Sequence, residues 1–142
     1  MKSLPVFLTP FLVILISCGA DETVKQSTEQ ESYKITRESL LKKELKRPLN
    51  FLVVGGHDKR NILGQTVVKG TITNKATVAV FKDVDIKLSF YSKTRALLET
   101  DKETVFEVLQ PGESKNFKTK YFAPKGTDSV ALEVLAAKAV PQ

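Results

Sequence analysis

The most distinctive chemical group in this sequence is the thiol of Cys18, the one cysteine among 142 residues. It lies in the stretch LISCGADE, where an uncharged run, residues 4–17, meets an acidic, polar segment. That run has 14 residues, whereas a helix needs about 20 apolar residues to cross a bilayer, and Pro5 and Pro10 interrupt it. A short apolar run after the positive start MKS is the pattern of a secretory signal peptide.

The residues Leu15-Ile16-Ser17-Cys18 resemble the bacterial lipobox, in which apolar and small residues precede a cysteine. The resemblance implies that residues 1–17 are removed, that the Cys18 thiol receives a diacylglyceryl group, and that the new amine is acylated with a chain such as palmitate. Two or three acyl chains hold a protein firmly on a membrane, whereas one chain holds it marginally. We therefore expect a lipoprotein of the bacterial cell envelope. The alternative is an ordinary signal peptide with an incidental cysteine.

The expected location is the outer membrane, on its periplasmic side or at the cell surface. Asp21 and Glu22 follow the cysteine closely, and in some Gram-negative bacteria acids at this place resemble a signal for export to the surface. Acidic residues also serve solubility alone, so both interpretations stay open.

Other residues that could do chemistry are few. His57 is the one histidine, so the chain has no second imidazole for a metal pair. Asp58 follows it, but neighbours on a strand point to opposite faces, which disfavours a Ser-His-Asp relay. Asp83 and Asp85 share a face, yet calcium takes about six to eight oxygen ligands and no acid-rich loop supplies the others. The sequence therefore favours a protein that is not an enzyme and uses no cofactor or metal.

The segment before the folded domain divides in two by charge. Residues 19–32 hold four acids and one lysine, with Val24 as the one large apolar residue, and such a composition predicts a flexible tether. Residues 33–47 hold six cations and two acids. Leu41 and Leu45, four residues apart, indicate a short helix that ends before Pro48, and an extended linker is the alternative. The predicted organisation is a signal peptide over 1–17, the cysteine, tether and basic segment over 18–48, and one domain over 49–142. The basic segment is either solvated or in contact with anionic headgroups.

From residue 49 onward the apolar residues recur with a period of two. Val84, Ile86, Leu88 and Phe90 alternate with polar residues, which is typical of a half-buried strand. Similar segments near 51–53, 68–73, 98–108, 117–121 and 130–134 are separated by turn signals such as Pro111-Gly112. No helical period appears after Pro48. The pattern predicts an all-β, immunoglobulin-like antiparallel sandwich of about seven strands.

Three stretches resemble the FxLYD domain, a small bacterial extracytoplasmic sandwich often found on lipoproteins. They are GTITN at 70–74, VDIKLSFY at 84–91, and LQPGES at 109–114 with Phe117. The naming motif falls on residues 88–92, LSFYS, where the two apolar identities are exchanged and Ser92 takes the place of Asp. The resemblance covers residues 66–140. It implies an immunoglobulin-like fold and carries no activity or binding residue to this chain.

Binding surfaces are the remaining class of site. Tyr91 follows the inward Phe90 and is expected to face water. A basic series is a second candidate surface for an acidic partner or a polyanion such as lipopolysaccharide. It comprises Lys115, Lys118, Lys120 and Lys125. The alternative is that these lysines are simply solvated and protect a sheet edge.

We therefore predict a lipid-anchored, non-enzymatic interaction or structural module with an envelope protein as partner. The alternative is an accessory binder of a polyanion or a glycan, although the absence of Trp leaves few aromatic platforms for sugars. The formal charge of +6 does not point to nucleic acid, which is not expected as a partner outside the cytoplasm.

Overall fold

The structure, a computed structural model, describes residues 22–141, and it describes the side chains of the helix from Thr28 onward. Cys18 and the predicted signal peptide lie outside these residues. The chain divides into two compact units, Met1–Lys34 and Ile35–Gln142. None of the helices within the described residues is long and apolar enough to cross a membrane.

A polar helix, α1 (Glu22–Lys46), occupies the segment where a tether and then a short helix or linker were expected. From Glu22 onward the structure has a helix where the sequence predicted a tether, and the helix is longer than expected. Its sequence contains neither glycine nor proline and is rich in Glu, Gln and Lys, which have high helix propensity. Low hydrophobicity therefore did not exclude a helix here. The helix ends before Pro48, as the sequence predicts.

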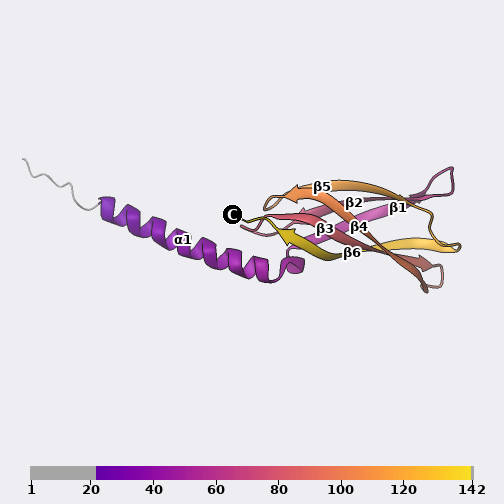
Figure 1. The fold of residues 1–142 in the computed structure, drawn as a ribbon, viewed down its shortest axis with the longest axis horizontal. Coiled ribbons are helices and arrows are strands. Elements are labelled where there is room, and N and C mark those ends of the chain that lie inside the picture. The colour runs from indigo at the N-terminus through magenta and orange to yellow at the C-terminus, as the bar shows by residue number, and fades with distance from the viewer. Residues whose placement is uncertain (1–21, 142) are drawn as a thin grey trace, which may run out of the picture. The chain divides into compact units, whose positions relative to one another are not determined.

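The rest of the described chain forms six strands after a short 3-10 helix, η1 (Pro48–Asn50). The strands are β1 (Leu52–Arg60), β2 (Thr66–Asn74), β3 (Phe81–Ser92), β4 (Leu97–Leu109), β5 (Ser114–Tyr121) and β6 (Thr127–Ala139). Sheet A has the order β1-β2-β5 and sheet B the order β4-β3-β6, and all neighbouring strands are antiparallel (Figure 1). This confirms the predicted β-sandwich. The described residues contain six strands rather than about seven, because residues 97–109 form one continuous strand.

The core follows from the alternation along the two central strands. On β3, Val84, Ile86 and Leu88 are fully buried and Phe90 is nearly so, as predicted. From sheet A, Ile72 of β2 packs in one cluster with Val84 and Ile86. Val68 packs in a second cluster with Leu88 and Phe90. Apolar side chains that point inward from both sheets thus fill the space between them, which is what stabilises a domain with no disulfide among its described residues.

The two ends of the sandwich carry different connections between strands. The connections β1–β2, β3–β4 and β5–β6 lie together at one end, which we call the loop end (Figure 1). The register places Thr66 beside Tyr121 and Ser92 beside Thr127, and the Arg60 guanidinium donates to the Thr127 carbonyl at 3.3 Å. The opposite end holds the β2–β3 connection and the β4–β5 turn.

At that opposite end, Glu44 fixes the last turn of α1 to the sandwich. Its buried carboxylate accepts the backbone N–H groups of Thr77 at 2.7 Å, Val78 at 3.0 Å and Ala79 at 2.8 Å. Leu41, one turn earlier, packs against the core. Burial raises the pKa of Glu44, but the three backbone hydrogen bonds outweigh it, so that the pKa lies below its ordinary value. The last turns of α1 therefore belong to the same compact unit as the strands, Ile35–Gln142.

Candidate functional site

The outer face of sheet A gathers cationic side chains from all three of its strands. On β2, Val68 and Ile72 point into the core, so Val67, Lys69 and Thr71 point outward. The register places His57 opposite Lys69 and Lys69 opposite Lys118, while Val67 lies between Lys59 and Lys120. We call this surface the lysine face, defined by four lysines and one histidine. They are Lys59, Lys69, Lys118, Lys120 and His57.

Among residues 22–141, no acid neutralises the charge of the lysine face. The outward positions of its three strands carry no Asp or Glu within the described residues. None of the four lysines has an ion pair in this part of the chain. Lys69 and Lys118 are direct register partners, and like charges directly opposite each other destabilise a sheet. The face therefore carries an electrostatic cost that an acidic ligand would relieve.

A shallow hollow of about 800 Å³ lies in this face. Gly55 lies in its lining, and a Cβ added there would meet nothing within 4 Å. Lys69 and Lys118 line it together with His57, and its floor includes polar side chains, among them Thr71, whose hydroxyl donates to the Asn116 amide oxygen at 2.7 Å. The hollow thus offers ammonium groups, hydroxyls and an amide at one place.

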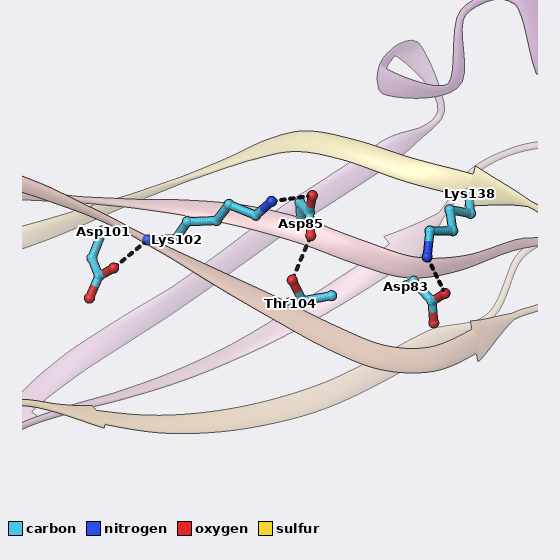
Figure 2. Close-up of polar contacts among 6 residues, drawn as sticks. All are labelled: Asp83, Asp85, Asp101, Lys102, Thr104 and Lys138. Atoms are coloured by element: carbon cyan, nitrogen blue, oxygen red, sulfur yellow. Dashed lines mark hydrogen bonds and ion pairs between the residues drawn. The ribbon is translucent and has the colours of Figure 1, made fainter.

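The outer face of sheet B differs, because three of its lysines pair with acids of the same sheet. Lys102 contacts Asp85 at 2.7 Å, and Asp85 also accepts the Thr104 hydroxyl at 2.6 Å (Figure 2). Lys138 contacts Asp83 at 3.1 Å. The hydrogen bond from Lys102, followed by that from Thr104, lowers the pKa of Asp85. Lys87 and Glu133 form a further ion pair on neighbouring strands.

These pairs also account for the two carboxylates that the sequence raised as calcium ligands. Asp83 and Asp85 each bind a lysine on a neighbouring strand, so their oxygens are occupied by cationic side chains. Within residues 22–141, no group of three or more His, Cys, Asp or Glu side chains could hold a metal ion.

The structure separates the basic series that the sequence suggested. Lys118 and Lys120 lie on the lysine face, whereas Lys115 is the register partner of the inward Ile72 and pairs with Glu113 at 2.9 Å. Lys125 lies in the β5–β6 connection at the loop end. Because side chains alternate along β5, Lys115 and Lys118 point to opposite faces of sheet A. Lys59 and Lys69 were missed, because the pairing of β1 with β2 and of β2 with β5 groups them with Lys118 and Lys120. Spacing along the chain does not show that pairing.

Two further sequence expectations concern exposure. His57 is exposed on the lysine face and Asp58 is half-buried, consistent with the expectation that they point to opposite faces. Tyr91 was expected to face water, but it is half-buried between its register partners Leu97 and Ser129. The exposed aromatic side chains of the described chain lie elsewhere. They are Tyr33, Phe106 and Phe122.

Comparisons with known proteins leave the family of this chain open. No family model matches it, and no curated protein matches it. Among solved structures, it is similar to the trimeric lipoprotein SadB of Salmonella enterica, with a TM-score of 0.42 and 14% sequence identity, over 79% of this chain and 75% of that chain. The resemblance to the FxLYD domain stays a prediction.

Proposed function

We propose that this chain is a lipid-anchored, non-enzymatic module of the bacterial cell envelope that binds an acidic partner through the lysine face. The observation that carries the proposal is the contrast between the two outer faces. On the outer face of sheet B three lysines pair with acids, whereas the outer face of sheet A presents four lysines and, among the described residues, no acid. An acidic partner would supply the missing counter-charge and relieve the repulsion between Lys69 and Lys118.

The position of Lys69 favours this proposal over a purely protective role for the lysines. Charged residues on an edge strand discourage pairing with other chains, and β5 is such an edge. Lys69, however, lies on β2, the central strand of sheet A, where both edges are already paired. Edge protection therefore explains Lys118 and Lys120 but not Lys69.

An acidic protein surface is the partner that we favour, and an acidic polysaccharide is the second candidate. The second candidate is supported by the hollow, because its hydroxyl and amide groups can hydrogen-bond sugar hydroxyls while the ammonium groups pair with acidic substituents. We assign no catalytic role to His57. Within the described residues, no hydrogen bond joins it to a carboxylate or a nucleophile that would activate it.

The anchor part of the proposal rests on the lipobox-like residues 15–18 and on the thiol chemistry of Cys18. A lipid at this position would keep the sandwich at a membrane surface, where partners in the envelope are within reach. The segment between the anchor and the strands includes α1, whose last turn carries the docked residue Glu44.

The proposal is tested with the purified full chain on an immobilised polyanion such as heparin. We expect the double variant Lys69→Gln/Lys118→Gln to elute at a clearly lower salt concentration than the wild type, because both lysines face the same hollow. The matched control is Lys42→Gln/Lys43→Gln, which removes the same charge from exposed positions of α1. Equal losses in both variants would show that net charge, and not the lysine face, governs binding.

The partner itself is sought by cross-linking in intact cells. We expect the wild type and the α1 control to give the same cross-linked product, and the Lys69→Gln/Lys118→Gln variant to lose it. A product retained in full by the lysine-face variant would contradict the proposed surface.

A further inference from the structure

The loop end exposes several large apolar side chains. Ile62 and Leu63, at the tip of the β1–β2 connection, are fully exposed and 74% exposed. Phe122, which directly follows β5, is 80% exposed. The register partners Thr66 and Tyr121 place the start of this second segment beside the base of the β1–β2 connection. Large apolar side chains gathered at one exposed end indicate a contact surface.

The β1–β2 connection is a turn that hydrogen bonds fix, and it carries Ile62 and Leu63 at its tip. The Asn61 side-chain oxygen accepts the backbone N–H of Leu63 at 3.0 Å and that of Gln65 at 2.9 Å. The Asn61 amide nitrogen donates to the Gln65 side chain at 3.0 Å. Gly64 takes the positive φ of 77° that closes the turn and that a side chain would disfavour. The hydrogen bonds fix the turn while its two apolar side chains stay outside.

Cationic side chains surround the apolar ones. The end of β1 and the β3–β4 and β5–β6 connections contribute exposed Lys or Arg residues. They are Arg60, Lys93, Arg95 and Lys125. None of them has an ion pair within the described residues. Arg60 and Lys93 also line a small hollow of about 400 Å³ between the connections, whose one acid is Asp128.

We infer that the loop end docks on an anionic phospholipid bilayer, with Ile62, Leu63 and Phe122 entering the headgroup region and the surrounding cations contacting lipid phosphates. This surface adjoins the lysine face, because Ile62 lines a hollow together with Lys69 and Lys118. The inference does not rest on the function proposed for that face. The inference depends on charge and shape. Apolar side chains at the tip of a turn suit insertion, and cations around them suit a negative surface that lies above an apolar layer. A folded protein partner would instead need a complementary pocket for a protruding tip.

The chain contains no tryptophan, which makes a single introduced indole a specific probe. The full chain carrying Leu63→Trp is combined with vesicles of phosphatidylcholine, with or without phosphatidylglycerol, and with brominated acyl chains as quenchers. We expect a blue shift and bromine quenching in the vesicles that contain phosphatidylglycerol, and loss of both at high salt. The control is Val53→Trp, at the other end of the same β1 strand, whose emission should not respond.

Because the indole reports its own surroundings, the result does not depend on whether Cys18 is lipidated. A second variant adds Lys93→Gln, Arg95→Gln and Lys125→Gln to Leu63→Trp. Each cation removed should weaken the contact about fivefold, and the three together about a hundredfold. Circular dichroism checks that each variant is folded.

Three outcomes would overturn the inference. One is an emission from Leu63→Trp that is the same with and without phosphatidylglycerol. Another is quenching that survives removal of the three cations. The last is a blue shift that grows with protein concentration without vesicles, which would assign the loop end to contact between copies of this chain.

Discussion

Glu44 connects helix α1 to the β-sandwich through one side chain. It is the one acid among the described residues that is almost completely buried, and it meets three consecutive backbone N–H groups. Consecutive N–H groups that converge on one point form an anion-binding concavity, and here the anion belongs to the chain itself. Without the carboxylate, those donors would lose partners in a place where water is largely excluded.

We expect Glu44→Gln to lower the free energy of unfolding by about 1.5–3 kcal/mol at neutral pH, the usual range for hydrogen bonds to a charged group. The glutamine keeps one acceptor oxygen but turns an NH₂ group toward backbone donors. Urea denaturation followed by circular dichroism measures the change. Glu38→Gln, at an exposed position of the same helix, is the matched control and should cost little.

The difference in stability between the wild type and Glu44→Gln should depend on pH. Because the pKa of Glu44 is lower in the folded chain than its ordinary value of 4.5, the carboxylate stabilises the fold above that value. The contribution is lost as the pH falls through the lower, folded pKa. The stability difference between wild type and Glu44→Gln should therefore narrow on acidification. A difference that stayed constant into strong acid would argue against the ionised carboxylate as its source.

At the scale of the elements, β3 organises the sandwich, since it is the central strand of sheet B and supplies the largest share of the core. Phe90 is 2% exposed, and its ring meets that of Tyr121 from sheet A edge to face, with centroids 5.9 Å apart. This contact joins the two sheets near the loop end. Tyr91, one residue later, points to the other side of sheet B and is half-buried.

We expect Phe90→Ala to destabilise the chain by about 3–5 kcal/mol, because a cavity opens between two sheets that cannot close on it. Tyr91→Ala should cost less, since its side chain leaves no enclosed cavity. Thermal or urea unfolding of the two variants in parallel gives the comparison. Equal costs would mean that the strand does not present these two side chains to opposite sides.

The elements also show what sequence can predict. The alternation of Val84, Ile86, Leu88 and Phe90 identified β3 and its inward face, because a period of two is a local property. The helical state of residues 22–32 was not predicted, because composition alone does not distinguish a polar helix from a tether. The role of Glu44 was out of reach for another reason. Nothing local to it specifies that the β2–β3 connection, more than 30 residues later, supplies its three donors.

At the scale of the whole molecule, the lysine face was predictable where its pattern is local to one strand and not where it depends on strand pairing. Lys118 and Lys120 were recognised in advance because they alternate along one strand. Lys69 joins them only through the β2–β5 register, and Lys59 only through the β1–β2 register. The loop end was not predicted at all, since its three connections are distant in sequence and come together only in the folded chain. The sequence showed the chemistry of single residues, but it did not show which residues from different strands lie together.

For the anchor, we expect Cys18→Ser to abolish lipidation and the cleavage before residue 18, because serine lacks the thiol that the modification requires. Detergent phase partition and intact-mass measurement check both effects. The variant should move to the aqueous phase or keep its leader. A Cys18→Ser chain with the mass and partition of wild type would contradict the lipoprotein proposal while leaving the lysine face and the loop end untouched.

The place of Glu44 along the chain also has a mechanical consequence. β1 is an edge strand of sheet A, and an edge strand pulled from its end can be peeled away one hydrogen bond at a time. Tension that enters from the N-terminal side of residue 35 reaches Glu44 before it reaches Leu52, where β1 begins. The three hydrogen bonds of one carboxylate would resist it together, and the Lys75 N–H that donates to the Phe51 carbonyl at 2.7 Å adds a second hold just before the strand. A sandwich held from this side is therefore protected against unzipping at the strand where it would otherwise start.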